Sequence, residues 1–214
     1  IRKLHAVETL GCAGVICTDK TGTITQNKMT VQRIWVPGRT LNVSGSGYRA
    51  QGAVEENGRP VQAARDAALG RLCEAASLCT TAHITRAKDV YDVMGDPTEV
   101  AVLVAAAKAG VTKEALLQQY TVIGENPFDA ARKRMSVTVS GPGGARLLCK
   151  GAPDMLLARC THIETPAGPR LLAPRDRADI NAACARMAGE ALRVLGFAES
   201  STPAAGEEKL CFLG

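Results

Sequence analysis

The amino-acid sequence predicts an α+β fold, because its helix-like and strand-like segments occur in separate blocks. Two helix-like segments, residues 61–82 and 96–108, follow one another, whereas strand-like segments dominate from residue 119 onwards. A doubly wound parallel sheet would instead require strands and helices that alternate regularly. The 214-residue chain is 46% hydrophobic but only 3% aromatic, so we expect a core of aliphatic side chains and alanine.

The first 60 residues combine two predicted strands with loops. Residues 14–18 are a short apolar run of the buried-strand type, which ends at Asp19. Residues 29–36 alternate apolar and polar side chains and are followed by a Pro-Gly pair, which predicts a half-buried strand. Residues 37–60 contain many glycines and are expected to form loops and short hairpins.

Two helices are predicted in the middle of the chain. Residues 61–82 place alanine, leucine and cysteine near helical spacing. In the second helix, Asp96 is a suitable N-cap and Pro97 suits the first helical position. Glu99 follows at the position from which a capping-box glutamate reaches back. A glycine after residue 108 is expected to end this helix.

Strands dominate the second half of the sequence. Met135, Val137 and Val139 alternate with polar residues, and residues 145–150 return after a Gly-Pro-Gly-Gly turn, which predicts a hairpin. The other predicted elements are a short helix from Pro153 to about Cys160, a helix around residues 180–191, and strands over residues 192–199 and 210–213.

Charge and cysteine content restrict the possible functions. A net charge of +5 without a dense basic tract suits a small anionic ligand and does not indicate nucleic-acid binding. The eight cysteines include no CxxC pair, so we expect reduced, mostly buried thiols in a cytosolic protein. No apolar run reaches the roughly 18 residues that a membrane span requires. The chain begins with isoleucine and ends within an apolar run, which suggests part of a longer polypeptide.

Asp19 is the first candidate for chemistry. A strand that ends in an aspartate, followed by a tight turn, presents the carboxylate at the edge of the sheet where ligands of α/β proteins bind. Lys20 adds positive charge, and the threonines and glycine that follow offer hydroxyl and backbone N–H groups to a phosphate. The turn alone leaves three roles open: turn residue, metal ligand and nucleophile.

Five sequence blocks resemble the P-type ATPases, in particular their type II, calcium-pump-like branch. The first, Asp19-Lys20-Thr21-Gly22-Thr23, matches the phosphorylation signature of that family, and its flanks at residues 7–12 and 25–31 match as well. The other blocks follow in family order and are residues 95–99, 127–137, 150–153 and 192–195. The resemblance therefore extends over nearly the whole chain.

The resemblance implies that Asp19 attacks the γ-phosphate of ATP and becomes an aspartyl phosphate. It assigns phosphate contacts to Lys20 and Thr23, and Mg²⁺ coordination to the Asp19 carboxylate and the Thr21 carbonyl. Phosphatases of the related haloacid-dehalogenase-like superfamily carry a second aspartate, their general acid and base, two positions after the nucleophile. Because Thr21 occupies that position here and cannot activate water, we expect the acyl phosphate to persist.

Phe128 is the second candidate. An aromatic ring followed by three cations at residues 132–134 suits an adenine ring and its phosphates. A core phenylalanine beside a solvated run of charge would show the same pattern. The resemblance assigns Phe128 to adenine stacking and places Lys133 and Met135 in the same pocket. On a strand, residues 133 and 135 would share a face.

Three further blocks complete the implied nucleotide site. The resemblance assigns Lys150 to the adenine pocket, gives Gly151 the role of leaving room for the ring, and lets Glu99 accept a hydrogen bond from the adenine amino group. Arg193, a charge within an otherwise apolar predicted strand, is placed near the phosphates. Local structure offers alternatives, namely a capping box for Glu99 and a strand-to-helix turn for residues 150–153.

The sequence departs from the family in two respects. Ala130 stands where an arginine often contributes to the nucleotide site. Phosphate contacts are therefore expected to be weaker or to come from Arg132 or Arg134. The distal Gly-Asp-Gly-x-x-Asn-Asp block, which completes Mg²⁺ binding in the family, is absent. We therefore expect this chain to bind ATP without turning it over. The sequence also contains no P-loop motif, which excludes a P-loop nucleotide site.

The resemblance implies an organisation in three parts. Residues 1–28 would be the first piece of a haloacid-dehalogenase-like α/β phosphorylation domain, residues 29–208 a nucleotide-binding domain with an antiparallel sheet flanked by helices, and residues 209–214 a return strand. The implied partners are ATP and the phosphorylation, actuator and membrane domains of the same pump, at the cytoplasmic face of the membrane. The flanks favour Ca²⁺ as the transported ion. The alternatives are a stand-alone nucleotide-binding regulatory module and a soluble phosphatase, and we expect the fragment to be monomeric.

Overall fold

The computed structural model describes residues 11–49, 51–88 and 90–214, and its centre is a seven-stranded sheet. In spatial order the strands are β11 (Arg170–Leu171), β10 (Cys160–Ile163), β13 (Leu210–Phe212), β12 (Gly196–Ser200), β9 (Gly144–Gly151), β8 (Arg134–Gly141) and β7 (Thr121–Asp129). All neighbours are antiparallel except β10 and β13, which run parallel. The predicted sheet flanked by helices is confirmed, but it is mixed, because the chain crosses over before β13 pairs with β10.

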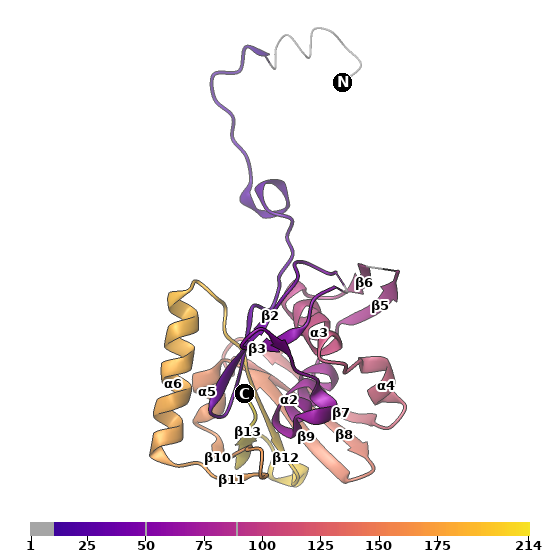
Figure 1. Cartoon of the computed structure of the whole chain (residues 1–214), viewed down its shortest axis with the longest axis vertical. Helices are drawn as coiled ribbons and strands as arrows, with labels where there is room; N and C mark the ends of the chain where they lie inside the picture. The colour runs from indigo at the N-terminus through magenta and orange to yellow at the C-terminus, as the bar shows by residue number, and fades with distance from the viewer. Residues whose placement is uncertain (1–10, 50, 89) are drawn as a thin grey trace.

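Helices cover both faces of the sheet, with α2, α3 and α4 on one side and α6 on the other (Figure 1). The bounds are α2 (Ala67–Leu78), α3 (Pro97–Lys108), α4 (Lys113–Leu117), α5 (Pro153–Leu157) and α6 (Pro174–Gly189). The predicted β8–β9 hairpin is confirmed. Successive side chains of this hairpin point to opposite faces of the sheet and join two separate hydrophobic clusters. Val137 and Leu148 pack with α2 on one face, whereas Leu147 and Cys149 pack with α5 and α6 on the other.

Residues 33–94 add two smaller sheets. One is a four-stranded antiparallel meander, formed by β1 (Arg33–Val36), β2 (Arg39–Val43), β3 (Val54–Glu56) and β4 (Arg59–Pro60). The other is a hairpin formed by β5 (His83–Ala87) and β6 (Val90–Met94). The predicted short hairpins within residues 37–60 are confirmed. The strand predicted over residues 29–36 begins only at Arg33.

Three further predicted boundaries are wrong, and local signals explain two of them. The helix predicted over residues 61–82 begins at Ala67, because the Asp66 side chain caps it by accepting a hydrogen bond from the Leu69 N–H at 3.1 Å. The helix predicted around residues 180–191 begins earlier, with Pro174 in its first turn. The strand predicted over residues 192–199 begins only at Gly196. Arg193 therefore lies in a loop.

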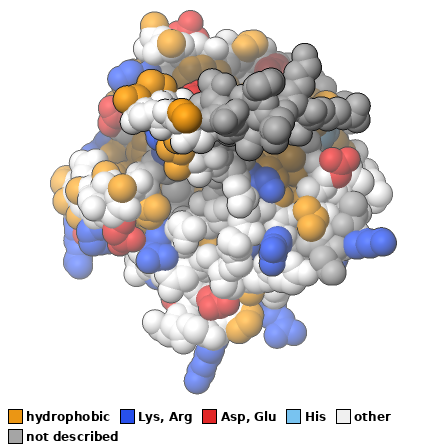
Figure 2. Space-filling view, turned by 90° about the horizontal axis from the view of Figure 1, so that it is seen from above, with side chains coloured by type: hydrophobic (Ala, Val, Ile, Leu, Met, Phe, Trp, Pro, Cys, Tyr) orange, Lys and Arg blue, Asp and Glu red, His pale blue; other side chains and the backbone are white. Residues whose placement is uncertain are grey.

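The segment of residues 11–28 leaves the body of the structure (Figure 1). Every residue in it is exposed, and residues 14–18 form no strand because no described segment pairs with them. A single turn, η1 (Lys20–Ile24), follows, with Gly22 at φ +78°. The predicted buried strand before Asp19 is therefore wrong for the described residues. Seen from above, lysine, arginine and acidic side chains are dispersed over the body (Figure 2).

The eight cysteines are all free, as predicted. Cys73, Cys79 and Cys149 are buried and Cys184 is half-buried. Burial raises the pKa of the Cys79 thiol to about 12, so this side chain behaves as a neutral core group. Over the described ranges, the longest apolar helices are too short to cross a lipid bilayer.

Candidate nucleotide-binding site

The first turn of α3 positions Glu99. Asp96 caps the helix as predicted, since its Oδ1 accepts hydrogen bonds from the N–H groups of Thr98 at 2.8 Å and Glu99 at 3.4 Å. Pro97 occupies the first helical position. The Glu99 side chain does not reach back toward Asp96, so the predicted capping box is wrong. The carboxylate points instead toward the end of α2 and toward β9.

The Glu99 carboxylate joins two segments that are distant in sequence. Its Oε1 accepts a hydrogen bond from the Lys150 Nζ at 2.5 Å. Its Oε2 accepts four hydrogen bonds of 2.8–3.0 Å, from the Thr80 hydroxyl, the Thr81 hydroxyl and N–H, and the Ala82 N–H. One oxygen is therefore saturated, whereas the other has a single donor and can accept another.

These contacts keep Glu99 ionised. Burial by itself would raise the pKa of the carboxyl, but the hydrogen bond and charge of Lys150 and the hydroxyls of Thr80 and Thr81 outweigh it and lower the pKa to about 2. The site therefore presents a fixed negative charge, that of Glu99, at any physiological pH.

A lowered carboxyl pKa predicts a specific acid dependence. The stability that Glu99 contributes is fully present above its unfolded-state pKa near 4.5 and is lost as the pH falls toward 2. The difference in unfolding free energy between the wild-type chain and Glu99→Gln should therefore shrink as the pH is lowered from 5 to 2.5. Urea unfolding at a series of pH values measures this difference, and a constant difference would contradict the assignment.

Lys113 supports the turn that holds Glu99, and no sequence pattern indicated this role. Its Nζ donates hydrogen bonds of 2.9 Å to the carbonyl oxygens of both Thr80 and Ala82. The side chain is buried, and this burial lowers its pKa. Lys113 lies on the five-residue helix α4, which is too short to show a periodic pattern. Without this lysine, two buried carbonyl groups would lose their donor.

The beginning of β8 and the end of β9 bring three of the predicted residues together. Met135 is 3% exposed and pairs with Lys150 across the two strands. Gly151 pairs with Arg134, and a Cβ atom on Gly151 would overlap the Lys133 carbonyl oxygen. The close approach of the two strands is therefore by itself a structural reason for a glycine at position 151.

Lys133 lies just before β8, in the turn from β7. Its φ is +51°, its N–H donates to the Asp129 carbonyl at 2.7 Å, and its carbonyl accepts from the Ala152 N–H at 3.0 Å. The argument that residues 133 and 135 share a strand face does not apply, because regular alternation starts only at Arg134. The Lys133 side chain is exposed.

Phe128 is 63% exposed, near the end of β7. The alternative interpretation of a core phenylalanine is therefore wrong. The β7–β8 register shifts between Asn126 and Asp129, so Phe128 lies in an irregular part of the ladder. Lys150, Lys133 and Phe128 lie at the same end of strands β7, β8 and β9, and Glu99 reaches this end from α3 through its contact with Lys150.

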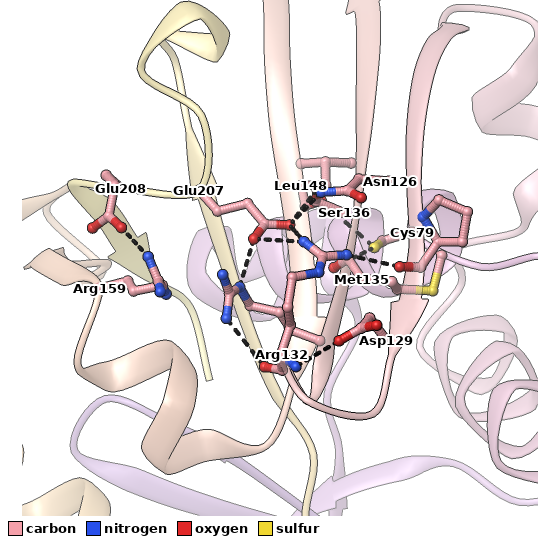
Figure 3. Close-up of polar contacts among 12 residues, drawn as sticks. Cys79, Asn126, Asp129, Arg132, Met135, Ser136, Leu148, Arg159, Glu207 and Glu208 are labelled. Carbon is pink, nitrogen blue, oxygen red and sulfur yellow. Dashed lines mark hydrogen bonds and ion pairs between the residues drawn. The ribbon is translucent and has the colours of Figure 1, made fainter.

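Two other arginines do not join this group. Arg132 and Arg134 both bind Glu207, through Arg132 Nη1 at 2.8 Å and Arg134 Nε at 2.5 Å (Figure 3). Arg134 alternates with Met135 along β8 and so faces the opposite side of the sheet. The suggestion that either of them replaces the arginine missing at Ala130 is not supported by these contacts.

Arg193 is exposed in the loop between α6 and β12. The first residue of β12, Gly196, pairs with Gly151, so the loop ends at the same end of the sheet as Lys150. Arg193 also lines an apolar cavity of about 470 Å³ between α2, α3 and α6, together with Met29, Trp35 and Met187. This cavity does not include Glu99, Phe128 or Lys150.

A protein-family model, described as P-type ATPase, cytoplasmic domain N, matches residues 68–214. The chain belongs to the P-type ATPases. The membership predicted from the blocks around Asp19, Glu99 and Lys150 is confirmed. It favours the pump interpretation over a stand-alone module or a soluble phosphatase.

Known P-type ATPases resemble the chain over most of its length. A calcium-transporting ATPase of Bacillus subtilis is 41% identical over 199 residues, which are 92% of this chain and 22% of that protein. The calcium-transporting ATPase type 2C member 1 of Pongo abelii is 36% identical over 219 residues, 100% of this chain and 23% of that protein. The chain thus spans about a fifth of the length of these relatives.

In this P-type ATPase chain, residues 19–23 lie apart from Glu99, Phe128, Lys133 and Lys150. Asp19, Lys20, Thr21 and Thr23 are all exposed in or beside η1. Within the described residues, no three acidic, cysteine or histidine side chains cluster as metal ligands. Asp19 and Thr21 supply one carboxylate and one carbonyl, too few to hold Mg²⁺ by themselves. The expected α/β phosphorylation fold is likewise not seen in the described residues.

Proposed function

We propose that this chain binds ATP and that, in the full-length pump, the bound ATP phosphorylates Asp19 to drive the transport of a cation, with Ca²⁺ favoured. The observation that carries the proposal is the Glu99–Lys150 pair at the same end of the sheet as the exposed Phe128, in a chain of the P-type ATPase family. Two relatives named calcium-transporting ATPases support the choice of ion.

The base of ATP is proposed to lie between Phe128 and the Glu99–Lys150 pair. Its ring stacks on the exposed face of Phe128, and its amino group donates to the Glu99 Oε1, the oxygen with only one donor. Met135 lies across the ladder from Lys150 and supplies a buried apolar surface under the base. Gly151 allows β8 and β9 to approach closely beside this pocket, where a Cβ atom would overlap the Lys133 carbonyl oxygen.

The phosphates are proposed to extend from this pocket toward the exposed cations of Lys133 and Arg193. In the full-length protein, transfer to Asp19 would be assisted by Lys20 and Thr23, and Mg²⁺ would require ligands besides Asp19 and Thr21. We infer that residues 1–28 belong to the phosphorylation domain and residues 29–214 to the nucleotide-binding domain, because β13 (Leu210–Phe212) pairs with β10 and β12 within the seven-stranded sheet. The partners would be the pump's own phosphorylation, actuator and membrane domains, at the cytoplasmic face of the membrane.

The test is a calorimetric titration of the chain with ATP. Phe128→Ala should weaken ATP binding about tenfold, because stacking of a base on an aromatic ring contributes roughly 1–3 kcal/mol. The free energy of unfolding should hardly change, since Phe128 is mostly exposed. Leu171→Ala is the matched control, because Leu171 is 72% exposed on β11 at the far edge of the sheet. Equal ATP affinity of Phe128→Ala and wild type would overturn the stacking proposal.

A further inference from the structure

The position of Phe128 is not determined by packing. The side chain is 63% exposed, and it lies where the β7–β8 register shifts between Asn126 and Asp129. Regular ladder hydrogen bonds are interrupted at such a shift. The ring can therefore be held in one place only if other contacts fix the backbone around it.

Arg132 supplies such a contact. Its Nη2 donates a hydrogen bond of 2.8 Å to the carbonyl oxygen of Pro127, the residue before Phe128. Its own N–H donates to the Asp129 Oδ1 at 2.8 Å, which closes the turn on the other side of Phe128. One arginine thus restrains the backbone on both sides of the aromatic residue.

Arg132 is held in turn by Glu207 (Figure 3). The Arg132 Nη1 donates to both carboxylate oxygens, at 2.8 and 2.9 Å. Glu207 follows η3 (Pro203–Ala205) and precedes β13, 75 residues from Arg132 along the chain. Because both the Arg132 guanidinium and the Glu207 carboxylate are charged, these hydrogen bonds are stronger than those between neutral groups.

The Glu207 side chain is itself held in place by several other donors. It also accepts hydrogen bonds from Arg134 Nε at 2.5 Å, Ser136 Oγ at 2.8 Å and Asn126 Nδ2 at 3.3 Å. Its side chain is only 10% exposed. Burial would raise the pKa of the carboxyl, but these donors outweigh it and lower the pKa. Glu207 therefore ties β7, β8 and the loop before β13 to one point.

We propose that Glu207 is a positioning residue for the nucleotide base: through Arg132 it fixes the Pro127 carbonyl and thereby the ring of Phe128. This inference rests on the proposed stacking of the base on Phe128. Ser136 and Arg134 alternate with Met135, so Glu207 lies on the opposite face of β8 and does not touch the base. Its effect is preorganisation, because a ring already held in place loses less freedom when ATP binds.

The competing explanation is that Glu207 only stabilises the loop between η3 and β13. Both explanations predict a less stable Glu207→Gln chain. Only the positioning role predicts that the effect on ATP binding depends on the presence of the Phe128 ring.

The experiment is a double-mutant cycle with ATP titration and thermal unfolding of each variant. Glu207→Gln should weaken ATP binding about fivefold, within the range of coupling through a shared network. Glu208→Gln is the matched control, because this neighbouring glutamate pairs with Arg159, away from the β7–β8 turn. Glu208→Gln should bind ATP like the wild type.

The second arm introduces Glu207→Gln into Phe128→Ala. ATP affinity should then fall no further, whereas the melting temperature should drop as much as it does with Phe128 present. If Glu207→Gln fails to fold, Arg132→Lys replaces it, since one ammonium group cannot bind Glu207 and the Pro127 carbonyl through a planar fork. An unchanged affinity in the single variants, or an equal loss without the ring, overturns the positioning role. If Phe128→Ala itself binds ATP normally, the stacking proposal fails instead.

Discussion

Replacing Lys150 with methionine is expected to lower the free energy of unfolding by about 3 kcal/mol at pH 7 and to weaken ATP binding at least about tenfold. The side chains of Lys150 and Glu99 are only 11% and 15% exposed. Removing the ammonium group leaves a largely buried carboxylate without its counter-ion, which is more costly than losing an exposed pair. Urea unfolding and calorimetric titration with ATP measure the two effects.

A second substitution separates charge from packing. The double variant Glu99→Gln, Lys150→Met should regain part of the lost stability, because no buried charge remains unpaired, but it should not regain ATP binding. The control is Arg175→Met, which removes a pair to Asp179 with side chains 91% and 63% exposed. That change should cost less than about 0.5 kcal/mol. A loss as small as this for Lys150→Met would contradict the assigned role of the buried pair.

The parts of the fold that could be predicted depend on neighbouring residues. Asp96 and Pro97 specify the start of α3 within two positions, and the structure confirms that start. The β8–β9 hairpin could equally be predicted, because the alternation that starts at Met135 and the glycine-rich turn specify it without distant contacts. Where a cap was overlooked, as at Asp66, the predicted helix extended too far toward the N-terminus.

The partners of Glu99 could not be predicted in this way. The turn that saturates its Oε2 lies 17–19 residues earlier in the chain, and Lys150 lies 51 residues later. Only the tertiary fold brings them together, so the local pattern indicated a capping box instead. Lys113 and Glu207 were missed for the same reason, since each acts through groups more than 30 residues away. Residues 14–18 were wrongly predicted to be a strand, because an apolar run becomes a strand only where another strand pairs with it.

In the full-length protein, Asp19→Asn is expected to abolish incorporation of ³²P from labelled ATP. The wild-type protein should form an acid-stable, hydroxylamine-sensitive acyl phosphate under turnover conditions, because a carboxylate is a competent nucleophile and an amide is not. Asp154→Asn is the control, since Asp154 is another exposed aspartate, on α5. It should leave the labelling unchanged.

The same substitution in the isolated chain should leave ATP affinity as it is. Asp19 is exposed in the segment that leaves the body of the structure, whereas Glu99 lies on α3 and contacts Lys150 at the end of β9. Binding and phosphorylation are therefore separable, and each can fail alone. Labelling that survives Asp19→Asn would place the nucleophile elsewhere. A wild-type full-length protein that binds ATP and never becomes labelled would mean that this chain binds the nucleotide without serving phosphoryl transfer.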